Sequence, residues 1–283
     1  MALHSPQFTA ANWPAAYVQA MPGFGLLTSN LPKHLLRLSA LEMDSCICEQ
    51  ALSFETKIED DLDSKTRAAY LMNRLSYELA RVVAAVDLTG HQTRHFTADN
   101  IAFTTTLEQT WYNGLSLPYL KTSFVVPPCF MIEQIDCAKQ VNATFLRIFA
   151  PVVRALTAIG KLSTGALWRI VGDGIAAGYL ELGKAAGDPE LARKRAEEIL
   201  EDHNTPLWNK KLGFIEIELP ADQSPTAKPI KETFRKRGGC CRYYTSRRSE
   251  GTYCPTCVHV KDHTAVLQQY LRPKTLETME NSA

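Results

Sequence analysis

The sequence lacks an excess of charge of either sign. It contains 31 lysine and arginine residues against 30 aspartate and glutamate residues, which gives a formal net charge of +1. Domains that bind nucleic acid as their main activity usually have a strongly basic composition or surface. The composition therefore argues against a general nucleic-acid binder, and no nucleic-acid partner is expected.

Long apolar runs are missing too. No run approaches the roughly 18 residues of a membrane-spanning helix, and residues 1–20 lack the charged start and apolar block of a secretory signal. Cysteines are few, eight in 283 residues, which suits a reducing cytoplasm better than a disulfide-stapled secreted protein. We expect a cytoplasmic protein without a transmembrane segment, and association with a membrane surface is compatible with that expectation.

The usual signatures of hydrolytic and nucleotide-dependent enzymes are absent from the sequence as well. No convincing hydrolase triad, phosphate loop or pair of catalytic carboxylates can be found. Gly172-Asp173-Gly174 follows no predicted strand and lacks the further glycines of a nucleotide loop. We interpret it as a site of close packing between helices.

The pattern of apolar residues predicts an α+β fold that is mainly helical, with a small antiparallel sheet. A body of residues 1–220, joined by a polar linker, is expected to precede a C-terminal module of residues 221–283. The predicted helices cover residues 15–20, 64–86, 141–159 with a kink at Pro151, a stretch starting at Ser163 or Thr164, and 189–201. The predicted strands cover residues 101–106, 114–126 and 214–219.

The most informative segment lies near the C-terminus, where four cysteines fall within eighteen residues. Cys240 and Cys241 are adjacent, and Cys254 and Cys257 follow with Cys-x-x-Cys spacing. Four thiolates so close together are the ligand set of a tetrahedral zinc site or of an iron–sulfur cluster. The segment therefore predicts a metal centre, with these four cysteines as ligands.

The adjacent pair favours a cluster over zinc. Neighbouring side chains in an extended segment point to opposite sides, which fits a single small ion poorly. A two-iron cluster is a wider target, and each of its irons can take one sulfur of the pair. Zinc held by the same four cysteines, as a structural clip in a module that binds nucleic acid or protein, remains the alternative.

The residues around the cysteines resemble a known family. Arg237-Gly238-Gly239-Cys240-Cys241-Arg242-Tyr243-Tyr244, followed by Cys254-Pro255-Thr256-Cys257, is similar to the C-terminal signature of the FhuF-type ferric-siderophore reductases. Leu167-Trp168 resembles a Leu-Trp pair at a similar distance upstream in that family. There are two departures: the gap between the cysteine pairs is longer than usual, and Thr245 stands where the family often has arginine.

The resemblance implies a [2Fe-2S] cluster held by Cys240, Cys241, Cys254 and Cys257. It implies an oxidoreductase that transfers one electron to a ferric siderophore, chiefly of the hydroxamate type, and so releases iron(II). The partners it implies are the ferric siderophore and an electron donor such as a ferredoxin or a flavin reductase. A siderophore synthetase, which contains a related domain, is a further alternative, but the chain is short for the ATP-binding portion of such an enzyme and shows no phosphate loop.

The segment around the cysteines is also basic. From residue 228 to 248 one acid, Glu232, stands against eight cations: Lys228, Lys231, Arg235, Lys236, Arg237, Arg242, Arg247 and Arg248. A [2Fe-2S] centre with four thiolates carries about two negative charges when oxidised and about three when reduced. Nearby cations favour the reduced state and attract an acidic donor. We expect Arg242, Arg247 and Arg248 to serve these roles, although a solvated basic loop or a nucleic-acid patch is the simpler interpretation. The aromatic residues Phe234, Tyr243, Tyr244 and Tyr253 are expected either to shield a cluster or to form the core of the module.

Overall fold

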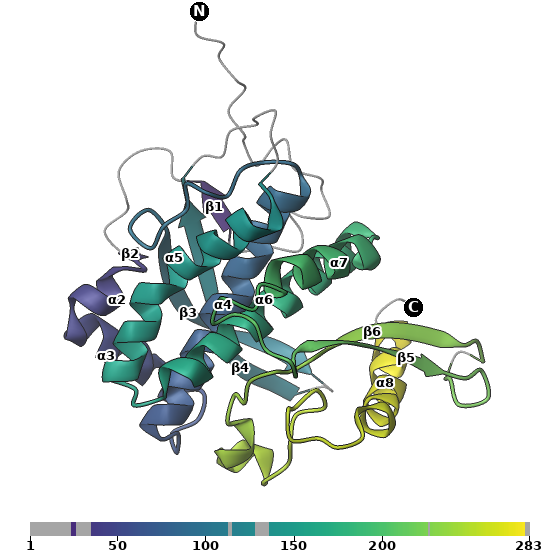
Figure 1. Ribbon diagram of the computed structural model, residues 1–283. Coiled ribbons are helices and arrows are strands. Elements are labelled where there is room, and N and C mark those ends of the chain that lie inside the picture. The colour runs from purple at the N-terminus through teal and green to yellow at the C-terminus, as the bar shows by residue number, and fades with distance from the viewer. Residues whose placement is uncertain (1–23, 27–34, 113–114, 128–135, 226, 281–283) are drawn as a thin grey trace, which may run out of the picture.

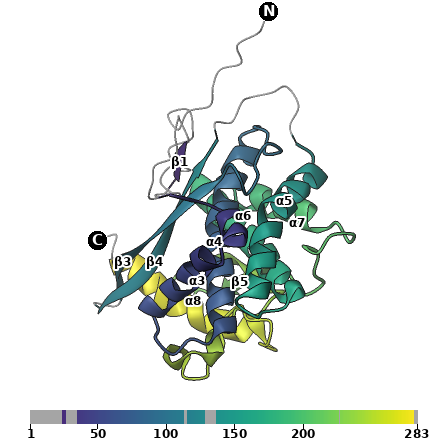
Figure 2. The same ribbon diagram turned by 90° about the vertical axis from the view of Figure 1, so that its left-hand side faces the viewer.

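The structure is a computed structural model that describes residues 24–26, 35–112, 115–127, 136–225 and 227–280. Helices predominate over two small sheets, so the fold is α+β as predicted (Figures 1 and 2). The short helix predicted at residues 15–20 lies outside the described residues.

The centre of the body is helix α4 (Ser64–Leu88), close to the helix predicted at residues 64–86. Asp63 caps its N-terminus, because the carboxylate accepts a 2.6 Å hydrogen bond from the Thr66 amide. Helix α6 (Thr164–Ala186), capped by Ser163 as predicted, packs along α4. A Cβ on Gly174 would lie 2.2 Å from the Ser76 Oγ of α4. The glycines of α6 thus permit the close helix packing expected there.

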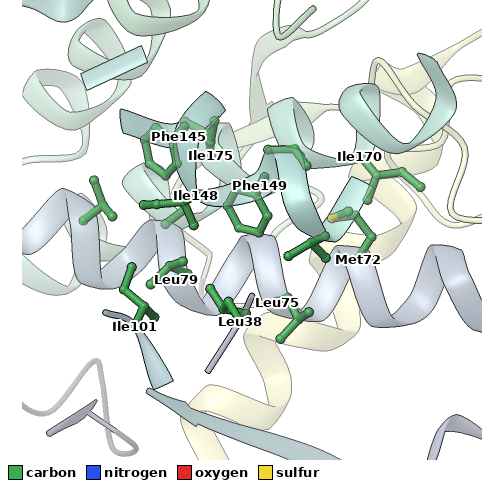
Figure 3. Close-up of a cluster of buried hydrophobic side chains, with 14 of the residues drawn as sticks. Leu38, Met72, Leu75, Leu79, Ile101, Phe145, Ile148, Phe149, Ile170 and Ile175 are labelled. Carbon is green, nitrogen blue, oxygen red and sulfur yellow. The ribbon is translucent and has the colours of Figure 1, made fainter. Parts of the chain in front are cut away.

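Helix α5 (Ala138–Ala158) supplies one wall of the main core and contains Pro151. Phe145, Ile148 and Phe149 are fully buried and lie against α4 side chains such as Leu79 (Figure 3). The most apolar window of α5 has a mean hydropathy of 1.2, so by length and composition the helix is a candidate membrane span. In the fold 56% of that window is buried by the rest of the chain, as in a core helix.

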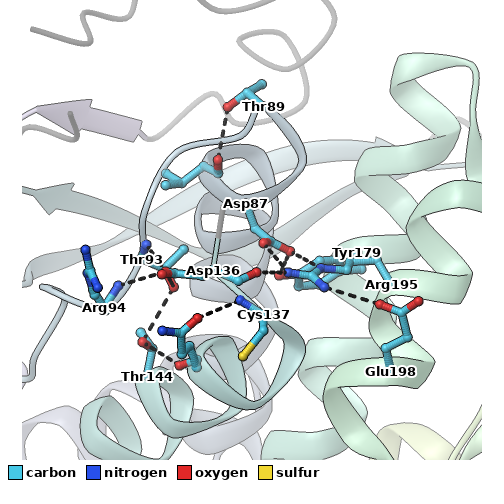
Figure 4. Close-up of polar contacts among 12 residues, drawn as sticks. Asp87, Thr89, Thr93, Arg94, Asp136, Cys137, Thr144, Tyr179, Arg195 and Glu198 are labelled. Atoms are coloured by element: carbon cyan, nitrogen blue, oxygen red, sulfur yellow. Dashed lines mark hydrogen bonds and ion pairs between the residues drawn. The ribbon is translucent and has the colours of Figure 1, made fainter. Parts of the chain in front are cut away.

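Helix α7 (Pro189–Leu200) is close to the helix predicted at residues 189–201, and its cap Asp188 accepts a 3.0 Å hydrogen bond from the Leu191 amide. A polar network joins α7 to the other helices (Figure 4). Arg195 donates to both carboxylate oxygens of Asp87 on α4, at 2.8 and 2.9 Å, and Tyr179 of α6 donates to the same carboxylate at 3.0 Å. The Asp87 side chain is 1% exposed, so these bonds stabilise a buried charge.

A four-stranded sheet covers one side of the helices. Its strand order is β1-β4-β3-β2, and its main feature is the predicted hairpin of β3 (Ala102–Tyr112) and β4 (Leu115–Val126). These two strands pair antiparallel, and Pro118 lies opposite Gln109. The shorter elements at this side are β1 (Phe24–Leu26), which is parallel to β4, β2 (Leu36–Arg37), α2 (Ala40–Met43), α3 (Ser45–Phe54) and the 3-10 turn η2 (Glu55–Lys57).

The C-terminal part has its own small core. Strands β5 (Gly213–Leu219) and β6 (Ile230–Lys236) form an antiparallel hairpin on which helix α8 (His263–Glu280) packs (Figure 1). The residues of this core are Ile217, Leu219, Phe234, Leu267 and Leu271. Between β6 and α8 lie the 3-10 turns η3 (Tyr243–Thr245) and η4 (Arg247–Ser249). Residues 220–229, predicted as a linker, connect the two paired strands. The domain boundary predicted at residues 220/221 falls in that connection and stays a prediction.

Candidate metal centre

The four cysteines predicted as ligands come together between β6 and α8. Cys240 and Cys241 follow β6 directly, and Cys254 and Cys257 lie in the loop that leads to α8. The Arg237 amide donates a 3.0 Å hydrogen bond to the Thr256 carbonyl and so joins the two segments. Cys241 and Cys257 are buried, whereas Cys240 and Cys254 are half-buried, and none of the four forms a disulfide.

The four thiols are linked by side-chain contacts. Cys240 contacts Cys257, and this contact lowers the pKa of Cys240 to about 7. Cys241 contacts Cys254, and this contact together with burial raises the pKa of Cys241. Within the described residues, no three His, Cys, Asp or Glu side chains converge closely enough to hold one metal ion. Cys254 and Cys257 also contact each other, so the four thiols form one series in the order Cys240, Cys257, Cys254, Cys241. Four thiolates are the ligand set of either a two-iron cluster or a zinc ion.

A buried carboxylate anchors the loop that carries the first cysteine pair. Asp173 of α6 is fully buried and accepts hydrogen bonds from the amides of Gly238 and Gly239, at 2.7 and 3.0 Å. Burial raises the pKa of this carboxyl group. A Cβ on Gly239 would lie 3.0 to 3.1 Å from Arg169 and the Ile170 amide, so the loop passes tightly over α6. Glycine at this position permits that approach.

Two arginines of the basic segment lie beside the thiols. Arg235 donates a 3.1 Å hydrogen bond to the Asp173 carbonyl, and Arg237 donates one of 3.1 Å to Asn73. Both side chains are partly exposed, but their Nε atoms are fully buried and have no hydrogen-bond partner among the described residues. Burial alone lowers the pKa of Arg237, but Cys241, Asp173 and the other nearby thiols together raise it.

These guanidinium groups bear on whether the site fits an anionic cofactor. A buried donor without a partner costs free energy, and a buried charge requires a counter-charge. Asp173 is one carboxylate for two arginines, and it is already bonded to two amides. A four-thiolate cluster with two or more negative charges would supply the remaining counter-charge. The residues present therefore fit a [2Fe-2S] group held by the four cysteines.

The three cations that the sequence singled out take different places. The Arg242 amide donates a 3.4 Å hydrogen bond to the Cys240 sulfur, and Arg248 lines the same cavity as Cys241 and Cys254. Arg242 forms a 2.8 Å ion pair with Asp63, and its backbone is in the left-handed region with φ of 62°. Arg247 is 75% exposed and lies 3.6 Å from Asp60. Arg248 is exposed and has no ion pair within the described residues. Arg235 and Arg237 also lie beside the thiols, and the roles expected of Arg242, Arg247 and Arg248 stay a prediction.

Two cavities flank the thiols, one for each side of the adjacent pair. The first, here called the Cys241 cavity, has a volume of about 610 Å³ and includes Cys241 and Cys254 in its lining. The second, here called the Cys240 cavity, has a volume of about 590 Å³ and includes Cys240 but none of the other three ligands. Adjacent side chains diverge as expected for an extended segment.

The four aromatic residues of the module take different places. Phe234 belongs to the small core, which agrees with the structural interpretation. Tyr243 and Tyr253 line the Cys241 cavity, whereas Tyr244 lines the Cys240 cavity. Tyr253 is 49% exposed, so it shields the thiols incompletely.

Sequence reasoning missed Asp173 as part of the site. It included Arg235 and Arg237 in the basic segment but expected Arg242, Arg247 and Arg248 to act on the cluster. Asp173 was attributed to helix packing, because its partners lie 65 and 66 residues away. For the arginines a signal existed, since residues two apart in a strand share a face and Arg237 continues the alternation of β6.

Comparison with protein-family models and with curated proteins found no match for this chain.

Proposed function

We propose that this protein is a ferric-siderophore reductase in which Cys240, Cys241, Cys254 and Cys257 hold a [2Fe-2S] cluster. The observation that favours this function is the meeting of four cysteine side chains with two guanidinium Nε atoms that have no hydrogen-bond partner among the described residues, next to a cavity of about 610 Å³. The cysteine signature resembles that of the FhuF-type reductases, as described above. When bound, the cluster supplies single electrons at low potential.

The Cys241 cavity suits the chelate. Its volume lies within the range of about 300–1,000 Å³ that is typical of small-molecule sites. Tyr70, Tyr119, Tyr243 and Tyr253 contribute rings and hydroxyl groups, and Leu120 contributes apolar surface. A siderophore likewise combines an apolar framework with oxygen ligands around iron.

The reaction requires no nucleophile or general base from the chain. Iron(III) is a hard cation that hydroxamate and other oxygen ligands hold tightly. One electron converts it to iron(II), which binds the same oxygens less strongly and exchanges them readily. The chain's own residues bind the chelate beside Cys241 and Cys254, and Arg235 and Arg237 stabilise negative charge at the thiols.

The test is anaerobic reoxidation of the pre-reduced protein by a ferric hydroxamate siderophore, followed by its visible spectrum. Iron(II) should appear in a ferrous chelator at about one iron per electron, because release needs a single electron. The gallium(III) form of the siderophore cannot accept the electron, so it should compete without reoxidising the protein. The proposal is wrong if no ferric siderophore reoxidises the protein faster than buffer does.

A cavity variant locates the chelate. Leu120→Trp should fill the Cys241 cavity and weaken binding of the gallium siderophore at least tenfold, about 1.4 kcal/mol, while the visible spectrum is unchanged. Leu117→Trp is the matched control, since Leu117 is on the same strand but does not line the cavity. Equal affinity of the two variants would place the chelate elsewhere.

The main alternative is zinc in the same four thiolates, as a structural clip. It rests on the same cysteines, and colour separates the two: iron–sulfur protein is brown and zinc protein is colourless. The resemblance of the cysteine signature to that of the FhuF-type reductases favours the two-iron group.

A further inference from the structure

The Cys240 cavity takes no part in the function proposed above. It lies on the other side of the adjacent cysteines from the Cys241 cavity and has nearly the same volume, about 590 Å³. The residues that define it are Arg169, Trp208, Lys210, Lys211, Cys240 and Arg242. It therefore offers a second approach to the thiols, separate from the chelate cavity.

This approach is strongly cationic. Arg169, Lys210 and Lys211 are exposed and form no ion pair within the described part of the chain. No acidic residue in the described ranges lines the cavity. Because the whole chain has a formal net charge of only +1, three uncompensated cations around one thiol are a local concentration of positive charge.

The surface also has an aromatic residue typical of protein interfaces. Trp208 is 38% exposed, and its ring stacks on that of His203 with centroids 4.4 Å apart. Tryptophan is enriched among the residues that contribute most to binding energy at interfaces. A neighbouring cavity shares Trp208 and Lys210 but adds Glu197 and Glu201, so the acid-free surface ends at Trp208.

Building on the function proposed above, we propose that this surface docks an acidic protein that carries one electron. Cations around an exposed ring match the acidic rim of such a carrier, and complementary charge accelerates the encounter. The reduced carrier loses one electron, and the iron(III) of the chelate in the opposite cavity gains it and becomes iron(II). Carrier and chelate thus bind on different sides of the thiols and do not compete for one cavity.

The test uses the holoprotein and a small acidic plant-type ferredoxin as the probe. Lys210→Glu/Lys211→Glu should slow reduction by the reduced ferredoxin at least about tenfold at low ionic strength. The difference should shrink at 1 M salt, where the Debye length is about 3 Å. Lys139→Glu/Lys194→Glu is the matched control with the same change in net charge, because neither residue lines a cavity next to a thiol. Reduced ferredoxin should reduce this control variant at nearly the wild-type rate.

Two further measurements separate docking from the reaction. Photoreduced deazaflavin, a small reductant that needs no docking surface, should reduce all variants equally. If it reduces none of them, the proposed function fails. Calorimetry with oxidised ferredoxin tests docking without any electron transfer, and the Lys210/Lys211 double variant should bind about tenfold more weakly than the control. Equal ferredoxin binding by the two double variants overturns the docking proposal. The proposal is also overturned if Lys210→Glu/Lys211→Glu loses binding of a single-stranded oligonucleotide while its ferredoxin binding is unchanged.

Discussion

Gly238 donates its backbone N–H to the buried carboxylate of Asp173 over 2.7 Å, although the two residues are 65 positions apart in the chain. Gly239 donates to the other oxygen of the same carboxylate, at 3.0 Å. The loop that delivers Cys240 and Cys241 is therefore held by α6. Asp173 thus helps to fix the position of the first cysteine pair, together with Asn209, whose side-chain amide donates a 2.8 Å hydrogen bond to the Gly238 carbonyl.

Asp173→Asn tests that dependence. The amide has a single acceptor oxygen, and its NH2 group would face one of the two backbone donors. Hydrogen bonds to charged groups contribute about 1.5–3 kcal/mol each, so we expect the free energy of unfolding of the cluster-free protein to fall by about 2 kcal/mol. Urea denaturation measures it. In the control Asp188→Asn, which alters an exposed helix cap, asparagine caps as well as aspartate, so the loss should be small. An equal loss in both variants would show that the Asp173 carboxylate stabilises the fold no more than an exposed helix cap does.

The second prediction concerns the ligands. Serine in place of Cys240, Cys241, Cys254 or Cys257 should abolish or severely reduce the visible absorption of anaerobically purified protein, because each thiolate completes a metal's coordination. Iron and sulfide analysis gives the stoichiometry. The controls are Cys46→Ser, Cys48→Ser, Cys129→Ser and Cys137→Ser, which should keep the spectrum. A wild-type spectrum in Cys241→Ser would show that the adjacent pair does not contribute both ligands.

The third prediction concerns the reduction potential. Arg237→Gln removes a cation beside three thiols, so the reduced, more negative state should lose stabilisation and the potential should fall. A tenfold change in a one-electron equilibrium is about 59 mV, and a fall of at least that size is expected in a spectroelectrochemical titration. Arg237→Lys, which keeps the charge, should recover part of it. Arg247→Gln removes a cation that is 75% exposed and should change the potential little. The reverse ranking would support the interpretation made from the sequence.

Sequence patterns predicted the elements whose signals are local. Leu71, Leu75 and Leu79 recur at helical spacing, and Asp63 and Asp188 are good N-cap residues. The helices predicted at residues 64–86 and 189–201 therefore end within two residues of α4 and α7. The β3–β4 hairpin was found for the same reason, since both strands and their connection are contiguous. In the site, the spacing of four cysteines within eighteen residues was sufficient to predict that these four side chains lie close together.

The contacts missed were those that join distant segments. Nothing near Asp173 in the sequence indicates that Gly238 would lie against it, because that contact arises only when β6 returns to α6. Charge spacing likewise could not tell that Arg242 would be neutralised by Asp63, 179 residues earlier, while Arg237 stays beside the thiols. Pairing β5 with β6 across residues 220–229 also required the tertiary structure, since that segment is polar and contains prolines.

The final prediction uses pH to test the burial of Cys48. This residue is 0% exposed on α3, and burial, with a smaller contribution from Glu49, raises the pKa of its thiol from 9.0 to about 11. Between these two pH values the unfolded thiol ionises while the folded thiol keeps its proton, so ionisation favours the unfolded state. The stability that the buried thiol contributes is complete below pH 9 and is lost as the pH rises to 11.

At pH 10 the loss amounts to about 1.4 kcal/mol, the equivalent of one pKa unit. Urea unfolding of the reduced, cluster-free protein at pH 8 and pH 10 measures it. Wild type should lose about 1.4 kcal/mol more than Cys48→Ala, whose side chain cannot ionise. The control is Cys46→Ala, which removes an exposed thiol two residues away on the same helix. This variant should keep the wild-type pH dependence of stability. Since every titrating group except Cys46 and Cys48 is common to all three proteins, an identical fall in all three would mean that Cys48 ionises in the folded state as readily as in the unfolded one.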